Sequence, residues 1–104
     1  AQPKETLKPS KPADHRWQRV GVDLFDLRGR KYLVIVDYFS NFAELDEAES
    51  TDAAMIVRLL KRQFARHGIP AQLVSDNGPP FNSYTFREFM REWGIEHQPV
   101  SPRH

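Results

Sequence analysis

Two aspartates of this chain have the side chains that are best suited to catalysis or to metal binding. Asp23 lies between Val22 and Leu24 in an apolar segment, and Asp76 ends the segment that runs through residues 71–75. A charged carboxylate inside an apolar strand is costly unless a partner or a metal ion compensates it. Mg²⁺ and Mn²⁺ prefer oxygen ligands, so two carboxylates that converge at one strand end suit such a cation. A single aspartate is explained more simply as a turn cap or as the partner of an arginine.

A sharp turn follows Asp76. Residues 77–80 read Asn-Gly-Pro-Pro, and all three residue types favour turns. The turn leads the chain away from the strand end and leaves the Asp76 carboxylate open. We expect Phe81 to anchor the turn to the core.

Three strands are predicted before the first helix. Residues 17–27 alternate between apolar and polar, as expected of a strand. Residues 31–38 are apolar at nearly every position, which predicts a strand buried on both faces. Residues 42–48 form a weaker edge strand with an acidic outer face. The connections are short, so the three strands are expected to be antiparallel neighbours.

A helix and a fourth strand follow. Residues 50–52 (Ser-Thr-Asp) predict a helix N-cap with an acidic first turn, and Gly68 and Pro70 end the helix. Its apolar stripe consists of Ala53, Ile56, Val57, Leu60 and Phe64. Residues 71–75 are then reached through a helical crossover, so this strand is expected to lie parallel to an earlier one.

The last elements complete an α/β fold. Ser83 begins a second helix, Gly94 closes it, and residues 95–100 form a final short strand. The apolar face of this helix consists of Phe86, Phe89, Met90 and Trp93. The order βββαβαβ predicts a mixed five-stranded sheet. Residues 1–16, rich in proline and lysine, are expected to form a flexible linker before a partial domain at 17–104.

Composition excludes several classes of protein. A chain of 104 residues is one domain or less. Its formal net charge of +1 excludes a strongly basic nucleic-acid coat, although local patches can still bind phosphate. The absence of cysteine excludes disulfides and cysteine–zinc sites. The longest apolar run, residues 32–36, is too short to span a membrane.

Other polar residues have simpler explanations than catalysis. Asp37 is expected to cap a turn together with Ser40. The basic side chains of the first helix are expected to form a solvated face; they are Arg58, Lys61, Arg62 and Arg66. His67, His97 and His104 lack metal-ligand spacing and are interpreted as loop or surface residues. Ser75 beside Asp76 suggests hydrolase chemistry, but no histidine relay is visible in the sequence, so we discount it.

Four segments together resemble a known family. They are VGVDLF, YLVIVDYFSNF, RHGIPAQLVSDNGPPF and WGIEHQPVSPRH, in this order and spacing. They resemble the integrase catalytic core of retroviruses and LTR retrotransposons, especially the Ty3/gypsy type. The resemblance implies a ribonuclease H-like fold and a D,D,E triad that binds two Mg²⁺ or Mn²⁺ ions. Asp23 matches the first acid and Asp76 the second, and both are the implied catalytic and metal-binding residues.

The resemblance also implies partners and a location. The implied DNA-contacting residues are Asn77, Gly78, Ser101 and Arg103. The implied partners are DNA and further copies of the chain, in a homodimer or higher oligomer, with no membrane. The location would be the nucleus of a eukaryotic host, or a viral or retroelement particle.

The third acid of the triad is not in this sequence. The spacing of the family places it at about position 112, whereas the chain ends at His104. The chain is therefore expected to be a fragment of a DNA integrase that binds a cation weakly and turns over DNA negligibly. A domesticated domain with a binding or dimerisation role is the alternative. A related ribonuclease H-like nuclease fits the acids but not the segments SDNGPPF and HGIP.

Overall fold

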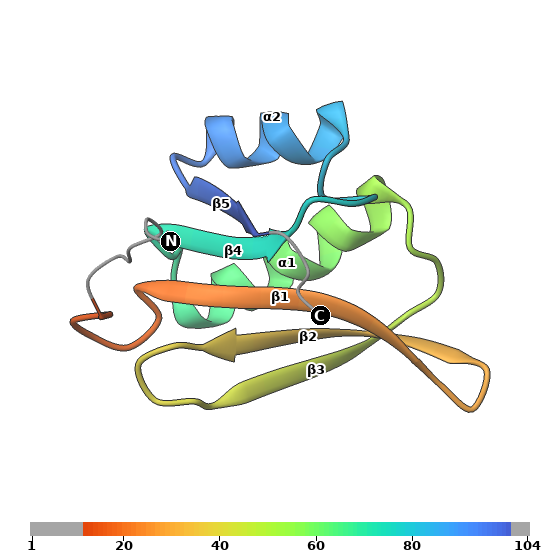
Figure 1. Ribbon diagram of the computed structural model, residues 1–104, viewed down its shortest axis with the longest axis horizontal. Helices are drawn as coiled ribbons and strands as arrows, with labels where there is room; N and C mark the ends of the chain where they lie inside the picture. The colour runs from red at the N-terminus through yellow and green to blue at the C-terminus, as the bar shows by residue number, and fades with distance from the viewer. Residues whose placement is uncertain (1–11, 101–104) are drawn as a thin grey trace, which may run out of the picture.

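The computed structural model describes residues 12–100, whose elements follow the predicted order βββαβαβ (Figure 1). The strands are β1 (Arg19–Leu27), β2 (Arg30–Asp37), β3 (Ala43–Ala48), β4 (Gln72–Asp76) and β5 (Glu96–Val100), and the helices are α1 (Ala53–His67) and α2 (Tyr84–Glu92). Within these residues, no helix is long and apolar enough to cross a membrane.

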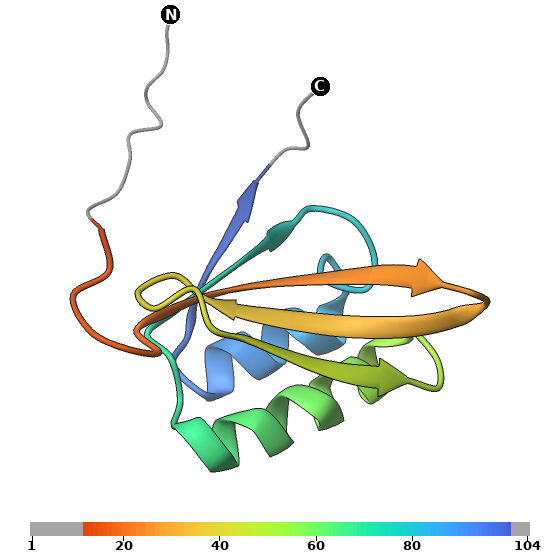
Figure 2. The ribbon, with the colours of Figure 1, turned by 90° about the horizontal axis from the view of Figure 1, so that it is seen from below.

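The five strands form one mixed sheet in the order β3-β2-β1-β4-β5. β1 pairs antiparallel with β2, and β2 pairs antiparallel with β3. β4 lies parallel to both β1 and β5, as a helical crossover requires. Both helices pack on one face of the sheet, and within the described residues the other face is uncovered (Figure 2). The predicted α/β fold is confirmed.

Local sequence explains where the elements begin and end. Arg28 and Gly29 both have positive φ, as the tight β1–β2 hairpin turn requires. The Asp52 side chain accepts a hydrogen bond from the Met55 backbone N–H, and Ser83 caps α2 in the same way. The predicted acidic first turn of α1 is absent, because Asp52 is itself the N-cap.

The core lies between the helices and one face of the sheet. Fully buried side chains from the sheet and from both helices meet there, including Val20, Leu33, Ile56, Leu60, Phe64, Leu73 and Phe86. The prediction that β2 is buried on both faces was wrong. Leu33, Ile35 and Asp37 face the helices, while Tyr32, Val34 and Val36 are only half-buried on the open face.

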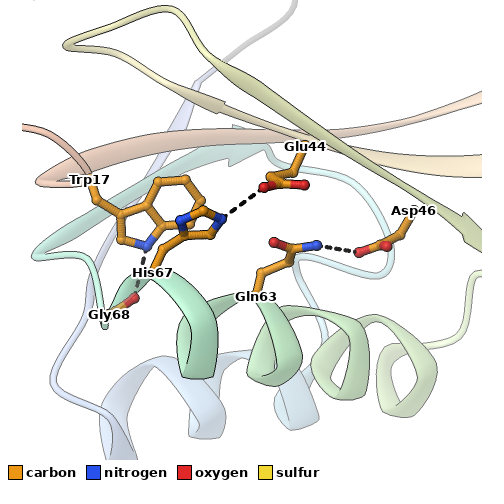
Figure 3. Close-up of polar contacts among 6 residues, drawn as sticks. All are labelled: Trp17, Glu44, Asp46, Gln63, His67 and Gly68. Carbon is orange, nitrogen blue, oxygen red and sulfur yellow. Dashed lines mark hydrogen bonds and ion pairs between the residues drawn. The ribbon is translucent and has the colours of Figure 1, made fainter.

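The acidic side of β3 faces α1 rather than solvent, which corrects the predicted acidic outer face. Figure 3 shows the contacts. His67 Nε2 lies 2.8 Å from Glu44 Oε2, and Gln63 Nε2 donates to Asp46 Oδ2 at 2.9 Å. These bonds hold the edge strand against the helix.

His67 is exposed, as expected of a surface residue, but its ring also contacts Trp17. It is the last residue of α1, and its ring lies 4.4 Å from the Trp17 ring (Figure 3). Trp17 is buried and donates from Nε1 to the Gly68 carbonyl at 2.8 Å. These contacts hold the segment just before β1 against the end of α1.

The basic side chains of α1 are exposed, as predicted, and two of them also have partners. Lys61 Nζ lies 5.6 Å from the Trp93 ring centroid and 5.8 Å from that of Phe89, so the ammonium covers the aromatic side of α2. Arg62 Nη2 lies 4.0 Å from Asp46 Oδ1, an ion-pair distance. Lys61 and Arg62 therefore have structural partners, which the expectation of a solvated face did not include.

Candidate active site

Asp23 and Asp76 lie at the point where β1 and β4 separate. The last pair in the β1–β4 ladder is Gly21 with Val74, and each aspartate lies two residues beyond its member of that pair. Figure 2 shows β4 and β5 turning away from β1 past this point. The carboxyl ends of diverging parallel strands commonly form a ligand-binding crevice. The sheet register therefore brings the two predicted residues together.

A groove of about 560 Å³ opens between the diverging strands. Its lining combines the two aspartates with mostly apolar residues of the diverging strands and their neighbours: Gly21, Val22, Asp23, Val34, Val36, Tyr38, Val74, Ser75, Asp76 and Val100. The two carboxylates are thus the charged groups of an otherwise apolar groove.

Asp23 is exposed on the open face of β1. Its Oδ1 accepts a hydrogen bond of 2.8 Å from the Leu24 backbone N–H. The argument that Asp23 needs a metal or a partner because it is buried was therefore wrong. The alternating pattern of β1 places Val22 against the helices and turns Asp23 outward.

Asp76 is half-buried and is held by the turn that follows it. Its Oδ1 accepts a hydrogen bond of 2.9 Å from the Gly78 backbone N–H. Phe81 is fully buried, and its ring lies edge-on to Phe86 at 5.2 Å, which confirms that it anchors the turn to the core.

The two carboxylates form a suitable donor set for a hard divalent cation. Within the described residues, Oδ2 of Asp23 and Oδ2 of Asp76 accept no hydrogen bond, so each carboxylate has an oxygen left for a ligand. In the same part of the chain, no group of three His, Cys, Asp or Glu side chains converges. Two carboxylates with water and phosphate oxygens are a common way to hold Mg²⁺.

The predicted DNA-contacting residues are only partly described. Asn77 is exposed and Gly78 half-buried in the turn beside Asp76, so both lie next to the groove. Ser101 and Arg103 lie outside the described residues, as does His104.

Tyr38 lines the groove, although the sequence analysis did not select it. Its ring lies over Gly21: a Cβ at Gly21 would come within 2.8 Å of Tyr38 Cε1. The Tyr38 backbone N–H donates to the Arg19 carbonyl at 3.0 Å. A glycine inside a strand often marks such a close approach, and this was the available signal.

Ser75 and His97 form a hydrogen-bonded pair, which the sequence analysis missed. His97 Nε2 lies 2.7 Å from Ser75 Oγ, and His97 is half-buried on β5 rather than a loop or surface residue. Burial lowers the pKa of His97 below its ordinary value of 6.5. Ser75 itself is 2% exposed and its hydroxyl donates to the Asp76 carbonyl. The hydrolase interpretation is therefore discounted because Ser75 is buried, not because a histidine is lacking.

Asp37 has a structural role, as predicted. Its carboxylate accepts hydrogen bonds from the Trp17 N–H, the Phe39 N–H and the Ser40 hydroxyl. Burial raises the pKa of Asp37, but these hydrogen bonds to the charged form outweigh it and hold the pKa below 3.8. Its side chain faces the helices, away from the groove.

Comparisons with known proteins identify the family and the fold of the chain. The sequence model of the family described as "Integrase core domain" matches residues 13–104. The chain is 33% identical over 93 residues to an uncharacterized protein of Caenorhabditis elegans, covering 88% of the chain and 7% of that protein. It is 37% identical over 91 residues to the Gag-Pol polyprotein of feline leukemia virus, covering 82% of the chain and 5% of the polyprotein. It is 27% identical over 95 residues to the retrovirus-related Pol polyprotein from transposon 297 of Drosophila melanogaster, covering 91% of the chain and 9% of the polyprotein.

A solved structure shares the fold. The intasome of simian T-cell lymphotropic virus, in complex with the PP2A regulatory subunit B56 gamma, superposes with a TM-score of 0.75 at 22% identity. The match covers 83% of this chain and 32% of that chain. The chain spans less than a tenth of these three curated relatives. It has the ribonuclease H-like fold and belongs to the integrase core domain family.

Proposed function

We propose that this chain belongs to the core of a metal-dependent DNA integrase that cleaves and joins DNA phosphodiesters. One observation carries the proposal: Asp23 and Asp76 line a single groove where β1 and β4 diverge. Relatives among retroviral and retrotransposon polyproteins support DNA as the substrate. In a eukaryotic host such a protein would act in the nucleus.

The residues of the groove have distinct roles in this proposal. Asp23 and Asp76 would hold a divalent cation through the oxygens that accept no hydrogen bond. Held there, the cation would supply Lewis-acid stabilisation of the charge that develops on the phosphodiester oxygens. The hydrogen bond from Gly78 keeps Asp76 oriented, and the exposed Asn77 would contact the DNA backbone.

The alternative function is a domesticated domain that binds DNA or a partner without catalysis. In residues 12–100 the groove contains two carboxylates and no third metal-type side chain near them. The residue at position 112 of the encoded protein separates the two functions. A glutamate there supports the enzyme, and a non-acidic residue supports the binding domain.

We expect DNA processing to require sequence beyond this chain. The test compares the 104-residue chain with a version extended past position 112, on a labelled DNA end with Mn²⁺. We expect the longer chain to process DNA at least about 100-fold faster, because two cations need a further ligand. EDTA should abolish the activity. Equal activity of the two chains would show that Asp23 and Asp76 are not part of a three-acid site.

We also expect self-association through the open face of the sheet. Outside the groove, this face presents apolar side chains that nothing in the described residues covers, including Phe25, Leu27 and Leu45. Exposed apolar patches of this kind commonly bind a partner. Light scattering should give about twice the monomer mass of 12.1 kDa at high concentration. Leu45→Glu should restore the monomer mass, whereas Thr85→Glu, on α2, should not; a monomeric parent chain would contradict the proposal.

A further inference from the structure

A serine and a histidine lie directly behind Asp76, on the opposite face of the sheet. Side chains alternate along β4, so Val74 and Asp76 face the groove while Leu73 and Ser75 face the helices. His97 is the β5 partner of Leu73 and lies on this covered side. Its Nε2 is 2.7 Å from Ser75 Oγ. Ser75 thus reaches the lining of the groove, whereas His97 is separated from the groove by β4.

The hydrogen bonds of this pair have a defined direction. A serine hydroxyl has one proton to donate, and Ser75 donates it to the Asp76 backbone carbonyl at 2.8 Å. His97 must then donate from Nε2 to Ser75 Oγ. The result is a relay of two hydrogen bonds from His97, through Ser75, to the backbone of Asp76.

The relay supplies a donor where the sheet lacks one. The Gln72 backbone N–H bonds the Gln18 carbonyl, so the even-numbered backbone groups of β4 point toward β1, and the β1–β4 ladder ends at Gly21 and Val74, before Asp76. The Ser75 hydroxyl bonds the carbonyl of Asp76, the last residue of β4, at this level of the sheet. That carbonyl belongs to the peptide that starts the turn, and the N–H of Gly78 in the same turn binds the Asp76 carboxylate. Fixing this peptide therefore helps to fix the carboxylate.

His97 is in turn held by the core. Its ring lies 5.3 Å from the Phe86 ring at an interplanar angle of 64°. Phe86 also contacts Phe81, the anchor of the turn after Asp76. Asp76 is thus held from both sides by groups that pack on one buried ring.

We propose that His97 is a positioning residue for Asp76, acting through the Ser75 hydroxyl to orient the carboxylate toward the groove. The inference rests on the proposed role of Asp76 as a cation ligand. His97 does not contact the groove itself, since it is absent from the groove lining. Partners that orient a metal ligand in this way commonly change metal affinity about 10- to 100-fold when removed.

The first test measures Mn²⁺ binding to the 104-residue chain by electron paramagnetic resonance. His97→Phe keeps a ring against Phe86 but removes the donor, and we expect about tenfold weaker binding. His97→Gln keeps an N–H donor and should bind nearly as well as the parent chain. Ser75→Ala should weaken binding as much as His97→Phe does, and the double variant should be no weaker than either, because both break one relay.

The Asp76→Asn variant distinguishes a failure of the proposed function from a failure of the positioning role of His97. It should remove most Mn²⁺ binding; if it does not, the proposed function fails and this inference fails with it. If Asp76→Asn removes binding while His97→Phe and Ser75→Ala leave it unchanged, the proposed function stands and the positioning role is wrong. Thermal melts identify any variant that does not fold.

A second measurement needs no variant. The ¹⁵N chemical shifts of the His97 ring in the parent chain report which nitrogen carries the proton. The relay requires the neutral ring with its proton on Nε2. A proton on Nδ1 would mean that Ser75 donates to the ring rather than to Asp76, which would overturn the inference.

Discussion

Asp76→Asn and Asp23→Asn should each slow DNA joining by at least about 1000-fold in a protein that contains this chain and continues past position 112. An amide has nearly the size of a carboxylate but no charge, so each variant keeps the shape of the groove and loses a cation ligand. Cation stabilisation of the transition state is worth several kcal/mol, and each 1.4 kcal/mol is a factor of ten. Rates on a labelled DNA end in Mg²⁺ measure the loss.

A matched control is available on the same strand. Asp26 is exposed on β1, three residues after Asp23, and its Oδ1 accepts from Lys31 Nζ at 3.0 Å. It does not line the groove, so Asp26→Asn should leave the rate unchanged within about twofold. A loss of less than tenfold for Asp23→Asn, or an equal loss for Asp26→Asn, would contradict the assignment of the groove as the metal site.

The convergence of Asp23 and Asp76 could be predicted from the sequence because it depends on topology. A helical crossover makes β4 parallel to an earlier strand, and parallel neighbours end at the same edge. The predicted reason for Asp23, a buried charge, was wrong nevertheless. The local pattern of apolar neighbours does not reveal which face of a strand is covered, and β1 turns Asp23 to the open face.

The same limit explains the error at β2. Tyr32, Val34 and Val36 are apolar, and the sequence pattern of β2 matches that of a strand covered on both sides. In the described residues only the face with Leu33 and Ile35 packs on helices. The residue types of a strand show that a face can be buried. Whether that face is buried depends on which other elements pack on it.

Contacts between distant residues depend on register, which the sequence does not state. Ser75 meets His97 because β4 and β5 pair Leu73 with His97, and a slip of one residue would turn His97 to the opposite face. Glu44 and Asp46 face α1 for the same kind of reason, since His67 and Gln63 are there to meet them. These pairs are visible only once the strands and helices are placed.

Asp37 offers a comparison between a structural and a functional aspartate. It is 2% exposed and lies on the helix-covered face, whereas Asp23 and Asp76 line the groove. Its three hydrogen bonds join the start of β1, through the Trp17 N–H, to the β2–β3 turn at Phe39 and Ser40. Hydrogen bonds to a charged group contribute about 1.5–3 kcal/mol each, and water replaces part of this at the exposed turn.

Asp37→Ala should therefore lower the free energy of unfolding by about 3 kcal/mol, and Asp37→Asn by about half as much, because the amide oxygen still accepts. The folded pKa of Asp37 is below its ordinary value of 3.8, so its stabilising effect is complete above that value and is lost as the pH falls through the lowered pKa. Urea unfolding at pH 7 and at pH 3 measures both effects, and the difference between parent and Asp37→Asn should shrink at the lower pH. Asp37→Asn should keep the Mn²⁺ affinity of the folded chain, unlike Asp76→Asn. Loss of Mn²⁺ binding without loss of stability would instead make Asp37 part of the site.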